Sequence, residues 1–367
     1  MIKHVKKNIL KKKRRKKPSI VIKTALSFLL VPLMIFSLAA CTQSRSPKPK
    51  EDEVPAGPRI ITDMAGRQVE IPAEVKTIAY VYGLVGNVLF TFGAQEMIVG
   101  VQGSNSFFEM LYPDIADVPL VGRSVADLEA LANVGPDIYI GRAYNVNDLE
   151  AVQSLGIPAI GISAESLDEI AVLYNLIGDI IGQEEKAAEL IAYYNSIYDQ
   201  ATKLVSDIPD NQRATAILMG ADIASVAHAK MIQSEMIVAA GGISCVVDSS
   251  VPTNKGIWPT AGTETIFAWN PDFIFITNSW AVSYTAEDIL KDPAWVGLKA
   301  VINGNVYTVP CNLESWEFPG LGTSLGTLWM ASKMYPQVIS KAKFNTIATE
   351  YYKRIYGLDV TPEFLGL

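Results

Sequence analysis

One phrase decides the fold because it occurs twice: residues 128–140 read LEALANVGPDIYI, and residues 263–276 read TETIFAWNPDFIFI. A Glu, a Pro-Asp pair and an apolar run recur at an offset of 135 residues. Each copy predicts an amphipathic helix, a turn ended by proline and a strand buried on both faces. Two such units indicate an α/β protein with two similar lobes, each a mainly parallel sheet flanked by helices. We expect a ligand cleft between the lobes.

The first 40 residues have the composition of a secretory signal. Ten Lys and Arg lie within residues 3–17, an apolar stretch covers residues 24–40, and the small-residue sequence LAA precedes Cys41. A basic region, an apolar region and small residues before a cleavage site are typical of such signals. Because the Cys directly follows, the segment resembles a bacterial lipobox, and we predict that Cys41 is lipidated. A plain signal peptide and an uncleaved anchor are the alternatives.

Charge is distributed unevenly along the chain. Residues 1–40 hold 11 of the 31 Lys and Arg and none of the 38 acids, so the part from Cys41 onward carries 20 cations against 38 acids, a net charge of −18. Such acidity argues against nucleic acid or anionic lipid as a partner. Residues 41–58, rich in Pro, Ser and charge, read as a tether. No later stretch is long and apolar enough to span a bilayer.

Strand-like and helix-like patterns alternate beyond the tether. We assign residues 59–183 to an N-terminal lobe, 184–208 to a connecting helix and 209–367 to a C-terminal lobe. The connecting helix is the second part of the longest helical pattern, after a break at Gly182. A surface helix inside one domain is the alternative.

Several phrases occur in the order found in one family: TDMAGRQVEIP (62–72), the two repeat copies, AAGG (239–242), LKAVINGNVY (298–307) and LGTLW (325–329). The chain thereby resembles, over about residues 58–357, the substrate-binding lipoproteins of ATP-driven importers for iron–siderophore, haem and cobalamin. The resemblance implies two lobes joined by one long helix, anchored outside the cytoplasm and without catalysis or a cofactor. It also implies a monomer whose partners are an ABC permease with its ATPase subunits.

The resemblance gives the repeated Glu a role. In the family this residue of each lobe docks onto Arg pockets of the permease, and the matching residues here are Glu129 and Glu264. One exposed carboxylate per lobe suits charge-guided docking. Alternatively, each Glu merely favours the N-terminus of its own helix.

Two isolated arginines are candidate ligand-binding residues. Arg123 and Arg142 are the only cations between residues 77 and 185, and each follows an apolar strand-like run. Ligands of α/β proteins bind beyond strand ends, and the guanidinium fork suits carboxylate or phosphate. A salt bridge to a nearby acid is the alternative for each.

Aromatic residues gather at similar positions in the pattern. Taken singly, each is more often a packing residue. Together they fit a cleft for a large, flat ligand, and the candidates are Tyr80, Tyr82, Tyr144, Trp258, Trp280 and Trp316.

The histidine and cysteine content limits other chemistries. His228 is the only histidine after residue 40, which argues against zinc or manganese receptors and against a metal site of the protein's own. It reads as a satisfied loop histidine or a haem ligand. A hydrolase would have one possible base and no Gly-x-Ser-x-Gly elbow. Cys245 and Cys311 can pair or remain as free thiols.

We therefore interpret the chain as a lipid-anchored extracytoplasmic receptor that delivers a metal chelate (ferric siderophore, haem or corrinoid) to an ABC importer. Two alternatives remain open: an oxyanion receptor for molybdate or tungstate on the same fold, and a ligand sensor on the same scaffold.

Overall fold

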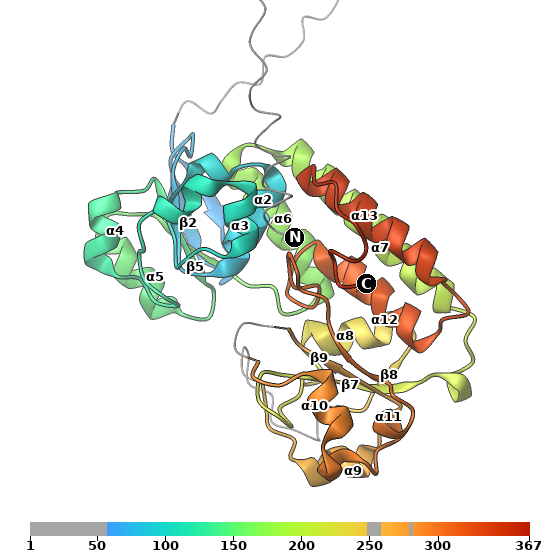
Figure 1. The fold of residues 1–367 in the computed structure, drawn as a ribbon. Helices are drawn as coiled ribbons and strands as arrows, with labels where there is room; N and C mark the ends of the chain where they lie inside the picture. The colour runs from blue at the N-terminus through green and yellow to red at the C-terminus, as the bar shows by residue number, and fades with distance from the viewer. Residues whose placement is uncertain (1–56, 248–257, 279–281) are drawn as a thin grey trace, which may run out of the picture. The chain divides into compact units, whose positions relative to one another are not determined.

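The computed structural model describes residues 57–247, 258–278 and 282–367. It contains two parallel four-stranded β-sheets with helices packed around them (Figure 1). The predicted signal segment, Cys41 and residues 41–56 of the tether lie outside the described residues. The first sheet has the order β4-β3-β5-β6 and the second β10-β9-β7-β8. Numbered by their order along the chain within each lobe, both sheets read 2-1-3-4. The predicted fold of two similar α/β lobes is thereby confirmed.

The elements of the first lobe alternate as the sequence predicts. The strands are β3 (Ile78–Tyr80), β4 (Ile98–Gly100), β5 (Ile138–Arg142) and β6 (Ala159–Ile162). The helices are α2 (Gly83–Phe92), α3 (Ser106–Leu111), α4 (Leu128–Val134), α5 (Val146–Gln153) and α6 (Leu167–Ile181).

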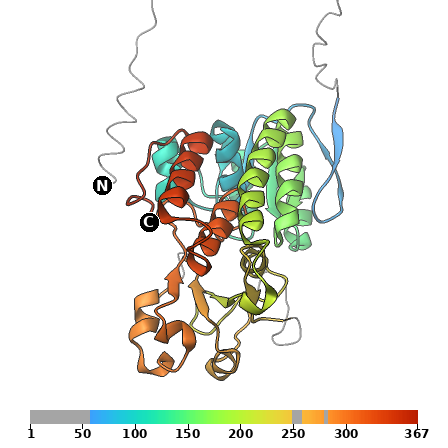
Figure 2. The same ribbon diagram turned by 90° about the vertical axis from the view of Figure 1, so that its right-hand side faces the viewer.

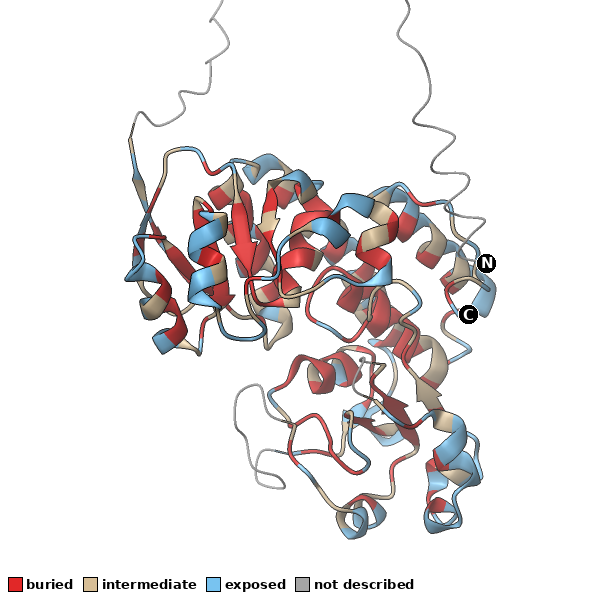
Figure 3. Cartoon of the chain, turned by 60° about the vertical axis from the view of Figure 1, so that its left-hand side comes forward, coloured by how far each residue is buried: buried red, intermediate tan, exposed pale blue. Residues whose placement is uncertain are grey.

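The second lobe repeats the arrangement with shorter helices on its outer side. Its strands are β7 (Thr215–Met219), β8 (Ile243–Ser244), β9 (Phe273–Ile276) and β10 (Val306–Thr308). Its helices are α8 (Ile232–Ala239), α9 (Thr263–Trp269), α10 (Ala286–Lys291), α11 (Lys299–Ile302), α12 (Gly322–Met334) and α13 (Lys341–Tyr356). The central strands β3, β5, β7 and β9 form most of the buried core, while the outer helix faces are exposed (Figure 3). The edge strand β8 is exposed at Ile243.

Helix α7 (Glu184–Val205) lies in the chain between the two sheets. It buries one face, from Ala187 to Val205, against α6 and α12. Helix α12 packs along α7 (Figure 2). Helix α13 contacts α7 through the Arg354 guanidinium, 4.2 Å from the Tyr193 ring centroid, and also contacts α2 of the first lobe. The C-terminal helices therefore pack on α7 and the first lobe as well as on the second sheet. None of the described helices combines the length and apolar character that crossing a membrane requires.

The repeated phrase folds the same way in both lobes. Helices α4 and α9 both end at a residue with left-handed backbone, Gly135 (φ 58°) and Asn270 (φ 46°), whose N–H bonds back to the helix. Pro follows, which cannot continue a helix, and the buried strand begins two residues later.

The Asp of each repeat copy links the first residues of two neighbouring strands by hydrogen bonds. Asp137 accepts hydrogen bonds through Oδ2 from the N–H of Thr77 (2.9 Å) and returns one from its own N–H to the Thr77 hydroxyl (2.8 Å). In the second lobe Asp272 Oδ2 accepts from the N–H (3.0 Å) and hydroxyl (2.8 Å) of Thr215, and its N–H donates to that hydroxyl (3.0 Å). The repeat is therefore a Thr–Asp pair that sets the strand register.

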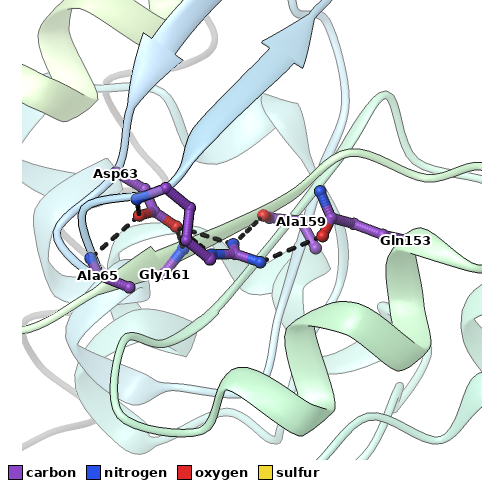
Figure 4. A network of polar contacts seen from close by, with 6 residues as sticks. Asp63, Ala65, Gln153, Ala159 and Gly161 are labelled. Carbon is purple, nitrogen blue, oxygen red and sulfur yellow. Dashed lines mark hydrogen bonds and ion pairs between the residues drawn. The ribbon is translucent and has the colours of Figure 1, made fainter.

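A two-stranded hairpin of β1 (Arg59–Thr62) and β2 (Gln68–Ile71) precedes the first sheet. The buried carboxylate of Asp63 accepts from the N–H groups of Ala65, Arg67 and Gly161 at 2.8–3.0 Å and forms an ion pair with Arg67 (2.8 Å) (Figure 4). Arg67 also donates to the carbonyl of Ala159 (2.5 Å). This network fastens the hairpin turn to β6.

The start of the hairpin is fastened separately. Arg59 pairs with the Asp179 carboxylate (2.6 Å) and donates to the carbonyls of Asp179 (2.5 Å) and Ile180 (3.0 Å). These groups lie in the last turn of α6, where a cation is also favoured by the helix dipole.

We expect Asp272→Ala to lower the free energy of unfolding by about 1–3 kcal/mol, because the N–H and hydroxyl of Thr215 lose their acceptor. Asp272→Asn should cost less, since the amide oxygen can still accept. Urea unfolding followed by circular dichroism checks both. Asp137→Ala should behave like Asp272→Ala, and an unchanged midpoint in both alanine variants would refute the role of the Thr–Asp pair.

Candidate ligand-binding site

The carboxyl end of the first sheet brings three predicted residues together. Since β3 and β5 are parallel with Tyr80 opposite Ile140, the residues two places further on, Tyr82 and Arg142, emerge side by side. The Arg142 guanidinium carbon lies 3.9 Å from the ring centroid of Tyr82 and 5.8 Å from that of Tyr144. Such a stack over two rings is a cation–π arrangement.

The two rings of this cluster differ in exposure. Tyr82 is 5% exposed. Burial raises the pKa of its hydroxyl, Arg142 lowers it, and the nearby Glu165 carboxylate raises it again. Tyr144 is 52% exposed. Within the part of the chain that the structure describes, Arg142 has no ion pair with a carboxylate. The cluster is therefore a cation between a buried and an exposed ring at a strand end.

Arg123 lies apart from this cluster. It is exposed in a loop closed by a bridge between Gly122 and Ala126, and the following residue, Ser124, has a left-handed backbone (φ 66°). The loop extends β4, at the edge of the sheet, through the bridge of Val101 with Leu120. No described contact joins Arg123 to Arg142, and its role as a ligand residue stays a prediction.

Two of the candidate aromatic residues lie in the core. Tyr80 is fully buried in β3. Its hydroxyl packs against Gly86 so closely that a Cβ on that glycine would lie only 2.6 Å from the hydroxyl oxygen. Trp316 is 1% exposed, and its indole N–H donates to the Tyr352 hydroxyl (2.8 Å). In this structure neither side chain has surface for a ligand, so neither enters the site proposed below.

The second lobe places a different set of groups at its strand ends. The ring of Trp258 packs against Gly220, the residue directly after β7. A Cβ on Gly220 would lie only 2.6 Å from that ring. Trp280 lies outside the described residues. Trp258 thus lies at the carboxyl end of the second sheet, and its role as a ligand residue stays a prediction.

Glu317 is a residue that the sequence analysis missed. Its buried carboxylate accepts from the hydroxyls of Thr277 and Ser315 and from the N–H of Asn278 (3.2 Å). The bonds fasten the loop after β10 onto the carboxyl end of β9. The only signal in the sequence is a pair of acids around a Trp, ESWE, which does not distinguish a buried carboxylate from a solvated one.

His228 and the two cysteines are integrated in the fold. His228 is 5% exposed, and its Nδ1 accepts from the N–H of Lys230 (3.1 Å), which favours the loop-histidine interpretation. Cys245 and Cys311 are both free thiols, and burial raises the pKa of each to about 11. No group of three His, Cys, Asp or Glu that could hold a metal ion occurs among the described residues.

Glu129 and Glu264 occupy equivalent exposed positions in the first turns of α4 and α9. Asp127 already caps α4, because its carboxylate accepts from the N–H groups of Glu129 (3.1 Å) and Ala130 (3.0 Å). The Glu129 side chain is therefore not needed as the cap of its helix.

Comparisons with known proteins agree with this architecture. The profile of the periplasmic binding protein family matches residues 78–313, and the chain belongs to that family. Its recognition as a relative of the substrate-binding proteins of ATP-driven importers is thereby confirmed.

Three proteins illustrate which binding proteins the chain is similar to. The chain is 21% identical over 333 residues to the molybdate-binding protein MolA of Haemophilus influenzae, covering 83% of this chain and 93% of MolA. It is 23% identical over 291 residues to the iron-uptake system-binding protein of Bacillus subtilis, and the match covers 76% of this chain and 88% of that protein. A periplasmic solute binding protein from Veillonella parvula superposes with a TM-score of 0.70 at 25% identity, covering 84% and 96%.

A buried acid in the loop that carries Trp316 makes stability depend on pH. Glu314 accepts through Oε2 from the Tyr356 hydroxyl (3.0 Å), and its Oε1 is fully buried without a partner among the described residues. Burial raises the pKa of this carboxyl from 4.5 to about 7. The folded state therefore keeps a proton that the unfolded state releases, and the free energy of unfolding falls between about pH 4.5 and 7.

We expect Glu314→Gln to remove this dependence. The variant should match the native protein near pH 4.5 and exceed its free energy of unfolding by up to about 3 kcal/mol at pH 8. Urea unfolding at both pH values measures the difference, with the exposed Glu350→Gln on α13 as control. Parallel pH profiles for the native protein and Glu314→Gln would contradict the buried-acid interpretation.

Proposed function

We propose that this protein is a lipid-anchored, extracytoplasmic receptor that hands an anionic metal chelate to an ABC importer. The observation that carries the proposal is the Arg142 guanidinium, stacked on Tyr82 and Tyr144 at a strand end without a carboxylate partner among the described residues. Family membership supplies the class of protein.

The chemistry of the cluster suits a ligand with negative charge and a flat part. A guanidinium binds carboxylate or phosphate oxygens with two parallel N–H donors. The tyrosine rings hold the guanidinium in place and add contact area. Trp258 and Arg123 would add contacts from other loops, Trp280 would add a further aromatic ring, and the chelate would hold the metal. Ferric siderophores, haem and corrinoids are the candidate cargoes, and the receptor itself would catalyse nothing.

A molybdate or tungstate receptor is the second candidate, because one relative is a molybdate-binding protein. Arg142 would pair with a tetrahedral oxyanion, but the aromatic rings would then contribute little. Isothermal titration with molybdate, tungstate, haemin, cyanocobalamin and ferric siderophores separates the two. A ligand sensor would bind the same cargo without supporting uptake.

Delivery would use the two lobes together. Glu129 and Glu264, one per lobe, would enter cationic pockets of a permease, while ATP hydrolysis would belong to its ATPase subunits. Cys41 would carry the lipid, and we propose that the receptor acts as a monomer. Partition of the native protein into a detergent phase checks the anchor, because an unlipidated chain would stay in the aqueous phase.

We expect Arg142→Ala to weaken the best-bound anionic chelate by roughly 10- to 150-fold, which corresponds to about 1.5–3 kcal/mol for a lost charged hydrogen bond. Arg142→Lys should lose less affinity than Arg142→Ala, because lysine keeps the positive charge but lacks the two parallel N–H donors of the guanidinium. Titration calorimetry measures both, and Arg123→Ala tests the second arginine in the same way. Unaltered affinity in Arg142→Ala, with an unaltered melting curve, would defeat the anionic-ligand proposal.

We expect Glu129→Lys combined with Glu264→Lys to abolish most uptake while the ligand Kd stays within about threefold, or under ~1 kcal/mol. The reversed charges would repel cationic permease pockets without touching Arg142. Uptake by cells and titration of the purified protein give the two readouts. Glu150→Lys, an exposed acid on α5, is the control, and a collapse of ligand affinity in the double variant would place these acids in ligand binding or stability instead.

A further inference from the structure

The second lobe contains a cavity that shares no residue with the Arg142 cluster or with Trp258. It has a volume of about 280 Å³ and opens beside β10, the edge strand of the second sheet. Its lining comes from β10, α12, α13 and the segments beside them. It includes the half-buried Tyr307, two nearly buried rings (Trp329, 3% exposed, and Phe344, 2%), Lys333, Lys341, Asn345 and Leu367.

Two cations meet in this cavity. The Lys333 ammonium lies 5.1 Å from the ring centroid of Tyr307 and 5.5 Å from that of Trp329. Burial lowers the pKa of Lys333, and repulsion from Lys341 lowers it further. Neither lysine forms an ion pair with any described residue, although Lys341 helps to lower the pKa of Glu363. A half-buried cation without an anion is costly, and the rings offset only part of that cost.

The neighbouring helix end adds positive potential and an unmet acceptor. Helix α13 begins at Lys341, and its first turn has no acidic residue to balance the helix dipole. One turn further on, the side-chain oxygen of Asn345 is buried with no hydrogen-bond donor in the described structure. Buried polar atoms normally have a partner, so this oxygen marks a place for a donor group.

We propose that this cavity binds a small organic anion with a flat apolar body and a hydrogen-bond donor. Its carboxylate would lie between Lys333 and Lys341, its ring would pack against the half-buried Tyr307 ring, and its donor would reach Asn345. This is a second ligand site, separate from that of the transported cargo and independent of the cargo's identity.

Three probes test the proposal by titration calorimetry on the native protein: 4-hydroxybenzoate, benzoate and sulfate. The first has a carboxylate, a ring and a hydroxyl donor, and it should bind at one site more tightly than benzoate, with sulfate weakest. Lys333→Met should weaken 4-hydroxybenzoate by about tenfold or more, as expected for a lost charged hydrogen bond. Lys341→Met should weaken it severalfold, and Asn345→Leu should reduce the binding of 4-hydroxybenzoate to that of benzoate.

Lys343→Met is the matched control, because Lys343 lies in the same helix turn as Lys341 and is exposed like it but does not line the cavity. Its effect should stay within about twofold. Three results would overturn the proposal: no saturable binding of any probe at millimolar concentration, equal losses in Lys343→Met and Lys333→Met, or sulfate binding as tight as that of benzoate. Loss of probe binding in Arg142→Ala would also overturn it, by placing the probe in the cargo site.

Discussion

The Thr–Asp hydrogen bonds at the start of each sheet are the constraint on which the candidate site depends. Thr77 and Asp137 hold the first residues of two parallel strands side by side. Five residues further along each strand, the same register delivers Tyr82 and Arg142 as neighbours. A shift by one residue would turn Arg142 to the other face of the sheet and separate it from the ring.

The same constraint explains why the two lobes differ at their strand ends. Five residues after Thr215 and Asp272 come Gly220 and Thr277, which carry neither charge nor ring. The Trp258 ring fills the space over Gly220, and the Glu317 carboxylate binds Thr277. At the carboxyl ends of its strands, the first lobe therefore presents side chains of the strand ends themselves. The second lobe presents Trp258 and Glu317, which come from loops.

This difference also decides what the sequence could predict. The lobes, the repeat and the positions of Tyr82, Arg142 and Tyr144 after predicted strands follow from local patterns, whereas their contact with one another is seen only in the structure. Tyr80 is the last residue of β3, two residues before Tyr82, and its side chain remains in the core, which the pattern alone does not distinguish from Tyr82. Trp316 and Glu317 depend on partners 36 and 40 residues away, Tyr352 and Thr277, and no local signal encodes such contacts.

The fastening of the hairpin has a mechanical consequence. Arg59 and Ile71 are paired at the open end of the hairpin, so a pull on the chain before residue 59 would act on β1 and β2 in unzipping geometry, in which ladder bonds break one after another. Arg59 meets that load first through its three bonds to the end of α6. Only after their rupture would tension travel along the hairpin to Asp63 and reach β6. Such a pull would thus meet two attachments one after the other, and the sheet that carries Arg142 would bear no load until the first had broken.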